Sequence, residues 1–201
     1  MIKRVFVGMI ALALMAGTVP AAEWEVDAAH TTIGFEVSHL VISSTTGKFK
    51  DFTGTVHFDG ENLEKGKVEF TVNVGSVDTD NADRDGHLVS PDFFNAEEFP
   101  TMTFKSTKVV SKGSKKFQLI GDLTIKGVTK EVTFDCKFRG TAEFMEMTKA
   151  GFSAETSIDR QEFGVSWNKN LDAGGVVVGN EVDINLEVEV NQKAMASHDS
   201  M

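Results

Sequence analysis

The segment EVDINLEVEV, residues 181–190, decides the fold class, because its hydropathy alternates at almost every position. Successive side chains of a β-strand point to opposite faces, so this segment predicts a strand with one dry face and one wet face. Strict alternation of this kind is typical of antiparallel sheets that are solvated on one side. The residues of the dry face are Val182, Ile184, Leu186, Val188 and Val190.

The same period of two runs through most of the chain. The loops KGSKK (112–116) and KGVT (126–129) are predicted to be hairpin turns. About eight long strands with one dry face each predict a closed barrel or a sandwich, and the pattern alone does not choose between them. The other predicted strands cover residues 32–40, 53–59, 67–75, 102–104, 117–125, 132–138 and 152–158.

The first 22 residues have the layout of a secretory signal peptide. Two basic residues precede an apolar run over residues 5–16, and small residues lead to a cleavage site after Ala21 or Ala22. The apolar run is too short to span a bilayer. We therefore expect export to a bacterial periplasm, one barrel domain over residues 23–191, and a flexible C-terminal tail over residues 192–201.

Composition narrows the function classes. The formal net charge is −10, and −12 without Lys3 and Arg4, which disfavours nucleic acid and anionic membranes as partners. No segment after the leader is long and apolar enough to predict an integral membrane protein. The chain has 16 phenylalanines and no tyrosine. This bias indicates a large apolar interior or an apolar ligand site.

An acidic insert, DTDNADRDGHLVSPDFF (78–94), interrupts the strand pattern. Its spacing is partly that of a calcium loop, but the segment that enters it, 67–77, alternates as a strand, and two basic residues lie inside it. An acidic connection with a short helix is favoured instead, with Ser90 as N-cap and Pro91 at the first helical position. The residues in the calcium-loop positions are Asn81, Asp83, Asp85, Gly86 and Asp92.

Six segments, in this order, resemble a known family. They are DAAHTTIGFEVSHL (27–40), GKFKDFTGTVHFD (47–59), SVDTDNADRDGHLVSPDFF (76–94), FPTMTFKS (99–106), GDLTIKGVTKEVTF (121–134) and IDRQEFGV (158–165). Together they are similar to the YceI-like family of exported polyisoprenoid-binding proteins, from about Trp24 to Val190. The resemblance implies an all-β fold: an extended, eight-stranded, antiparallel, lipocalin-like barrel with a short helical insert. It also implies that the insert's acids are helix caps and arginine partners rather than metal ligands.

The resemblance and the strand parity together indicate which residues would line a lumen. Four polar residues are candidates for contact with a ligand head group at the rim: His39, Arg84, His87 and Arg160. Arg84 and Asp85 are expected to pair with each other or with Arg160. The predicted lumen residues are Phe35, Val37, Phe58, Phe70, Phe104, Leu123, Phe134, Phe138, Phe152 and Ile158.

No catalytic residue, metal site or cofactor is predicted. The single cysteine, Cys136, lies on a dry face and is expected to be a buried, inert thiol. Nucleophile-elbow, zinc-protease and phosphate-loop motifs do not occur. The favoured function is binding of a long-chain polyisoprenoid, either a polyprenyl quinone or a polyprenol, or of a similar amphiphilic lipid. The purpose would be transport, storage or sequestration, and a homodimer is compatible with it.

Two other functions stay open at this point. One is an enzyme that acts on an isoprenoid or quinone, which would need an activated acid, base or metal at the lumen mouth. The other is a calcium-dependent or partner-binding β-module with a filled core.

Overall fold

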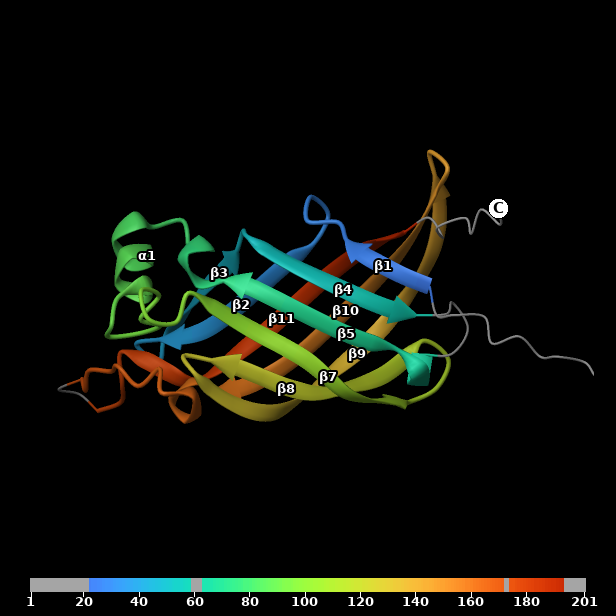
Figure 1. Ribbon diagram of the computed structural model, residues 1–201. Helices are drawn as coiled ribbons and strands as arrows, with labels where there is room; N and C mark the ends of the chain where they lie inside the picture. Colours follow the sequence, from blue (N-terminus) through green and yellow to red (C-terminus); the bar gives the residue numbers. More distant parts are fainter. Residues whose placement is uncertain (1–21, 59–62, 172–173, 194–201) are drawn as a thin grey trace, which may run out of the picture.

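A computed structural model describes residues 22–58, 63–171 and 174–193 (Figure 1). In these residues a single sheet follows the order β1-β4-β5-β7-β8-β9-β10-β11-β2-β3-β6. The strands are β1 (Ala22–Val26), β2 (Thr32–His39), β3 (Ser43–Phe49), β4 (Phe52–Phe58), β5 (Lys67–Asn73), β6 (Val77–Asp78), β7 (Thr101–Ser111), β8 (Lys116–Ile125), β9 (Val128–Phe144), β10 (Met147–Asp159) and β11 (Val178–Gln192). The helices are α1 (Ala82–Val89) and the 3-10 turns η1 (Leu63–Lys65), η2 (Val74–Ser76) and η3 (Arg160–Phe163).

The sheet closes on itself through β1, which pairs with both β4 and β11. Trp24 lies opposite Val56 on one side and opposite Gln192 on the other. Every strand pair is antiparallel, and β3 continues into β4 after two residues, so the wall is a closed barrel of eight long strands. Closure satisfies the strand edges and rules out the sandwich.

The predicted strand parity is confirmed. Along β11 the residues at 182, 184, 186, 188 and 190 face inward, and those at 183, 185 and 187 are exposed. Both predicted hairpin turns also form: Lys126 and Gly127 adopt φ values of 49° and 76°, which suits a two-residue turn between β8 and β9.

Three strands, β1, β3 and the two-residue β6, were not expected. In β3, SSTTGKF, the inward positions carry Thr45, Gly47 and Phe49, so hydropathy barely alternates. In β1 the five residues AEWEV adjoin the signal-like leader and offer one large apolar side chain. Their pairing comes from long, apolar neighbours on either side rather than from a local signal.

The helix of the insert begins earlier than expected, which corrects the predicted cap. Asn81 caps α1: its side-chain oxygen accepts a hydrogen bond from the Arg84 backbone N–H at 3.0 Å. Ser90 instead ends the helix, with ψ of 168° and its hydroxyl donating to the carbonyl of His87 at 2.7 Å. Pro91 explains this ending, because a residue before proline is disfavoured in helical conformation. Three of the five calcium-loop positions, Asp83, Asp85 and Gly86, thus lie on a helix rather than in a loop.

The barrel has two different ends. At one, which we call the Trp24 end, an apolar cluster contains Trp24, Val56, Phe58, Ala150 and Val190. At the other, the Arg160 end, lie α1, the residues after it, and residues 164–171 and 174–177 between η3 and β11 (Figure 1). No helix among the described residues is long and apolar enough to cross a membrane. The predicted signal peptide lies almost wholly outside the described residues, as does the tail beyond residue 193.

Candidate functional site

The barrel encloses an elongated cavity with a volume of about 250 Å³ and a wall that is almost wholly apolar. In the described part of the chain, its only titratable wall residues are His57, Cys136 and Arg160. An engineered apolar cavity of roughly 150 Å³ stays dry and binds benzene. The arrangement therefore favours an apolar ligand.

Nine of the ten residues expected in the lumen lie on the cavity wall. They occupy inward positions of β2, β4, β5, β7, β8, β9 and β10: Phe35, Val37, Phe58, Phe70, Phe104, Leu123, Phe134, Phe152 and Ile158.

The tenth, Phe138, packs behind the wall. Its ring centroid lies 5.6 Å from that of Phe58 and 5.2 Å from that of Phe152. Strand parity gives the direction of a side chain correctly, but it does not give the depth of the cavity along the barrel.

Other wall residues come from segments without strand periodicity. Leu88 of α1 and Phe93 and Phe94 after it line the cavity at the Arg160 end, together with Phe163 and Val165. The Asp-Phe-Phe and Phe-Gly-Val segments were visible in the sequence, but their side-chain directions depend on how the insert folds over the barrel. Sequence reasoning therefore missed this part of the wall.

Two glycines hold aromatic rings against the wall. Gly47 pairs with Phe35, and Gly54 pairs with Phe70. A Cβ on Gly47 would lie 2.4 Å from the Phe35 ring, and one on Gly54 would lie 2.9 Å from the Phe70 ring. Each ring thus lies directly against a glycine of the neighbouring strand. The two phenyl rings therefore stay at the wall and leave the lumen open.

Arg160 is the cation on the wall. It is 6% exposed and sits in η3, directly after β10. Its Nε donates to the carbonyl of Gly179 at 2.7 Å, its Nη1 to that of Val165 at 2.5 Å, and its Nη2 to that of Val178 at 3.4 Å. Burial lowers the pKa of the guanidinium from its ordinary value. The side chain therefore ties the start of β11 to the segment after η3 and also borders the cavity.

The other three rim candidates lie at the Arg160 end but not on the cavity wall. His39 is the last residue of β2, paired with Val178 and Ser43. The side chain of Arg84 donates to the hydroxyl and carbonyl oxygens of Thr79. His87 bonds Asp92 at 3.0 Å.

The pairing expected for Arg84, Asp85 and Arg160 is wrong. The carboxylate of Asp85 accepts bonds from the backbone N–H and hydroxyl of Thr79, at 2.9 and 2.6 Å. Arg84 bonds the same threonine from the other side. The buried Thr79 therefore organises the insert, whereas Arg160 bonds backbone carbonyls of residues 165, 178 and 179 instead.

Cys136 is buried on the wall, between Phe117 and Ala154 of the neighbouring strands. Burial raises the pKa of its thiol to about 12. The thiolate is the reactive form of cysteine, so this environment keeps the side chain unreactive near neutral pH, as the sequence predicted.

A polar network lies outside the cavity, where β1, β10 and β11 meet. Lys149 Nζ donates to Asp27 at 3.0 Å, to Glu189 at 2.8 Å and to Asn191 at 2.7 Å. His30 bonds Asp27 at 3.0 Å. The hydrogen bond from Lys149 is the main cause that lowers the pKa of Asp27 well below its usual range. The ammonium group takes the place between these carboxylates that a metal ion would need.

Comparison with known proteins agrees with this geometry. The family model described as the YceI-like domain matches residues 24–190, which run from β1 to β11. The chain belongs to the YceI-like family. Protein YceI of Escherichia coli O157:H7 is 40% identical over 197 residues, covering 95% of this chain and 100% of that protein. The resemblance seen in the sequence is therefore confirmed.

Solved structures of other proteins show the same fold. The crystal structure of BcnA from Burkholderia cenocepacia has a TM-score of 0.71 and 27% identity, and covers 82% of this chain and 98% of that one. A polyisoprenoid binding domain from Saccharophagus degradans has a TM-score of 0.66 with 13% identity, covering 86% and 99%. At that identity, the second likeness shows the fold alone.

Proposed function

We propose that this YceI-like protein binds one long-chain polyisoprenoid, or a similar amphiphilic lipid, in the lumen of the barrel. The ligand predicted from the sequence is a polyprenyl quinone or a polyprenol. The observation that carries the proposal is the apolar cavity inside a closed barrel whose aromatic rings lie against the wall. The Saccharophagus domain of the same fold is described as polyisoprenoid binding, which supports this ligand class.

The physical driving force is burial of the chain. Each CH₂ group removed from water contributes about 0.8 kcal/mol, so a chain of about twenty carbons contributes on the order of 16 kcal/mol before any costs. Ordering the chain and docking it consume a large share of that free energy. Apolar walls discriminate poorly between similar chains, so we expect loose selectivity for chain length.

The nine predicted wall residues would contact the chain, and Arg160, the one rim candidate on the cavity wall, would meet a head group. His39, Arg84 and His87 would act at the same end, outside the wall. We further propose that the signal-like leader directs the protein to the periplasm, where it transports, stores or sequesters its ligand.

Binding rather than catalysis is proposed, because the titratable groups of the described wall are poorly suited to proton transfer. The pKa of Cys136 is raised to about 12, and Arg160 is a permanent cation. His57, the third titratable residue, lies between the buried Val56 and Phe58 of β4, so strand parity directs its imidazole outward, away from the lumen. An acid or base poised near the working pH is what catalysis would need.

Organic extraction of the purified exported protein, followed by mass spectrometry, tests the proposal. A stoichiometric polyprenyl species would support it and identify the ligand. If the exported protein yields no lipid, and incubation with polyprenols and quinones loads none, the lumen is not a lipid site. A denatured sample of the same protein controls for lipid adsorbed during purification.

A further inference from the structure

Arg160 has hydrogen-bonding capacity that the protein does not use. A guanidinium carries five N–H donors, and three carbonyl oxygens accept from this one. Each nitrogen therefore has one acceptor, and two N–H groups remain. Because the side chain is 6% exposed and borders the cavity, water offers little replacement.

The charge of Arg160 also has no ion-pair partner, although the neighbouring Asp159 attracts it electrostatically. Among residues 22–58, 63–171 and 174–193, no carboxylate forms an ion pair with it. The nearest candidates are committed elsewhere: Asp159 accepts from the backbone N–H of Gln161, and Glu162 pairs with Lys130. Backbone carbonyls supply partial negative charge but no full counter-charge. A buried cation without a counter-ion is costly, and a ligand that supplies one recovers part of that cost.

We propose that Arg160 binds an anionic oxygen head group, a phosphate or carboxylate, on the long apolar chain held in the lumen. This inference rests on the proposed lipid-binding function. The planar guanidinium matches the geometry of both oxyanions. A neutral quinone or alcohol would occupy a donor but leave the charge unpaired, so the anionic amphiphile is the better complement.

The two ends of the cavity then set the direction of the ligand. Phe58, Val56 and Phe152 face the cavity at the Trp24 end, and the cluster behind them is apolar. The head group would lie at Arg160 and the chain would run toward Phe58. Leu88, Phe93 and Val165, which line the cavity on the Arg160 side, would exclude water from the ion pair and keep it largely insensitive to salt.

A series of ligands with one chain and different head groups tests the inference on the unmodified protein. Farnesol, farnesyl monophosphate, the matching carboxylic acid and a farnesyl trimethylammonium salt would each compete against a fluorescent apolar probe. The anions should bind roughly tenfold tighter than the alcohol, and the ammonium salt should bind weakest. The preference should persist at about 0.5 M salt, where exposed charges are screened.

Each outcome of that series has a separate meaning. If all four compounds bind equally, Arg160 is a structural clamp and the inference fails, although the proposed lipid-binding function stands. If none of the four displaces the probe or loads the protein, the proposed function itself fails. A preference for phosphate over carboxylate, or the reverse, would identify which oxyanion the site takes.

Substitutions sharpen the assignment. Arg160→Gln keeps two amide donors but no charge, so the anion-to-alcohol affinity ratio should fall to about one while the alcohol still binds. Arg160→Lys should retain part of the ratio.

Arg139→Gln, which removes an exposed cation paired with Glu187, is the matched control and should leave the ratio unchanged. If it lowers the ratio as much as Arg160→Gln does, net charge rather than the site explains the preference. Should Arg160→Gln not fold, the ligand series decides alone.

Discussion

The two ends of the barrel are built from different kinds of side chain. At the Trp24 end, Trp24 is 2% exposed, its indole N–H donates to the carbonyl of Phe58 at 3.0 Å, and the surrounding cluster is apolar. At the Arg160 end, a buried cation borders the lumen under a cover made of α1 and non-strand segments. The Trp24 end is a packed apolar cluster, which we call the floor of the barrel. The Arg160 end combines a buried charge with an apolar cover, made of α1 and the non-strand segments.

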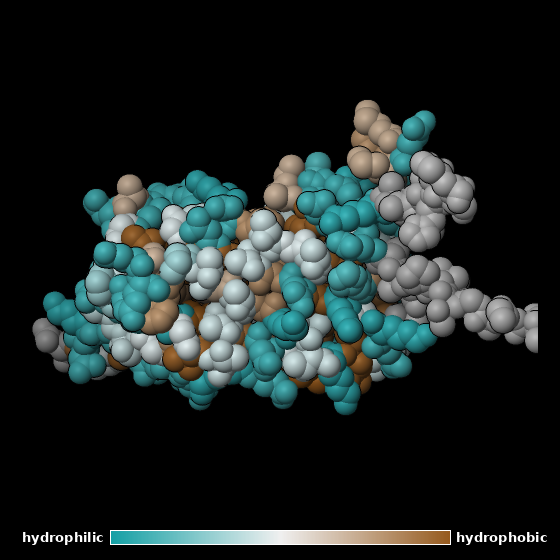
Figure 2. Space-filling view, viewed as in Figure 1, coloured by the Kyte–Doolittle hydropathy of each residue, from teal (hydrophilic) through white to brown (hydrophobic). Residues whose placement is uncertain are grey.

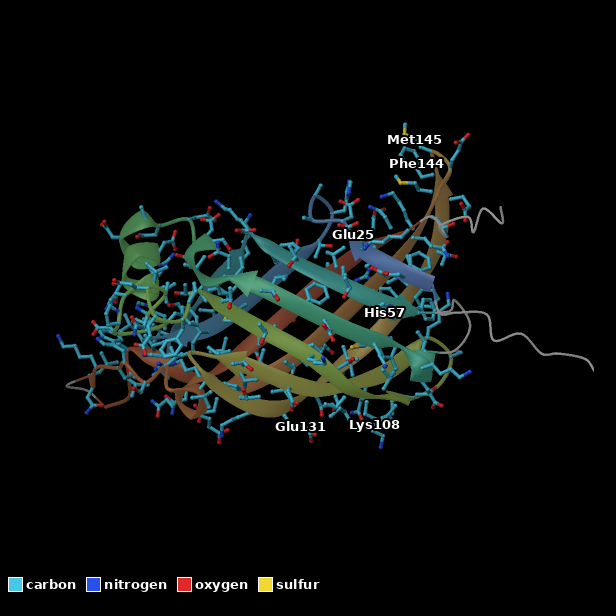
Figure 3. All side chains as sticks on the ribbon, viewed as in Figure 1. Glu25, His57, Lys108, Glu131, Phe144 and Met145 are labelled. Atoms are coloured by element: carbon cyan, nitrogen blue, oxygen red, sulfur yellow. The ribbon has the colours of Figure 1, made fainter. Side chains whose placement is uncertain are left out.

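The outer surface of the barrel differs from the lumen in polarity. Charged residues such as Glu25, Lys108 and Glu131 lie on the outside of the barrel, where Figure 3 labels them. The β9–β10 hairpin projects beyond the Trp24 end and exposes Phe144 and Met145, the latter to 78%. Figure 2 shows this tip as an apolar spot above a largely hydrophilic face. The lumen wall is therefore almost wholly apolar inside a barrel that is largely hydrophilic outside.

The largest expected effect comes from charging the lumen between the two ends. Phe70→Glu places a carboxylate on the apolar wall, where desolvation costs several kcal/mol. Lipid binding, measured by probe displacement, should become undetectable. Thr71→Glu, the exposed neighbour on β5, is the control and should bind as the wild type does. Circular dichroism checks that both variants fold. Normal binding by folded Phe70→Glu would mean that the lipid lies elsewhere.

A smaller effect is expected on the free energy of unfolding, and it distinguishes the packing of the floor from that of the cover. Trp24→Ala should destabilise the protein by about 3–5 kcal/mol, because a fully buried indole leaves a large cavity. Trp167 is half-buried beside His87 and Phe93, with ring centroids 5.1 and 5.2 Å away. Trp167→Ala should lower the free energy of unfolding, measured with urea, by less than half as much. Equal losses for both would show that the two ends are packed alike.

A several-fold effect on binding should follow from filling one glycine. In Gly54→Ala, the new methyl group would meet the Phe70 ring at about 2.9 Å and push it into the lumen. Affinity for the lipid should fall while the barrel still forms. Gly86→Ala in α1 is the control, because a Cβ there meets no atom within 4 Å. It should stabilise the fold by about 1 kcal/mol and leave binding unchanged. Unaltered affinity in Gly54→Ala would contradict the proposed role of that glycine.

The smallest effect concerns the outside of the Trp24 end. The pKa of Asp27 is lowered from 3.8, chiefly by its hydrogen bond from Lys149. A lowered folded-state pKa stabilises the protein above the unfolded pKa, and this stability is lost as the pH falls through the folded value. Asp27→Asn should therefore lower stability at neutral pH, and the difference between the two proteins should shrink as the pH falls below about 3.8 and vanish only below the folded-state pKa. Asp183→Asn, on the exposed face of β11, controls for the loss of a charge. A difference independent of pH would argue against the ion pair.

The sequence predicted the barrel wall well because each inward position is set by a period of two. Long strands such as β11 carry that signal on every residue. The start of the helix in the insert was harder to predict. Asn81 and Ser90 are both good cap residues, and only the proline after Ser90 and the anchoring of Asp85 by Thr79 favour the earlier start. Which polar residue would reach the lumen was also undecided, because Arg160 and Arg84 look alike in sequence but differ in burial.

Fluorescence quenching by brominated lipids tests the central claim most directly. Trp167→Phe leaves Trp24 as the reporter of the floor, and Trp24→Phe leaves Trp167 near the head group. A lipid with bromine at the end of its chain should quench Trp24, and one with bromine beside the head group should quench Trp167. If lipid binds but quenches neither tryptophan, it lies outside the lumen. If the two patterns are exchanged, the head group lies at the Trp24 end.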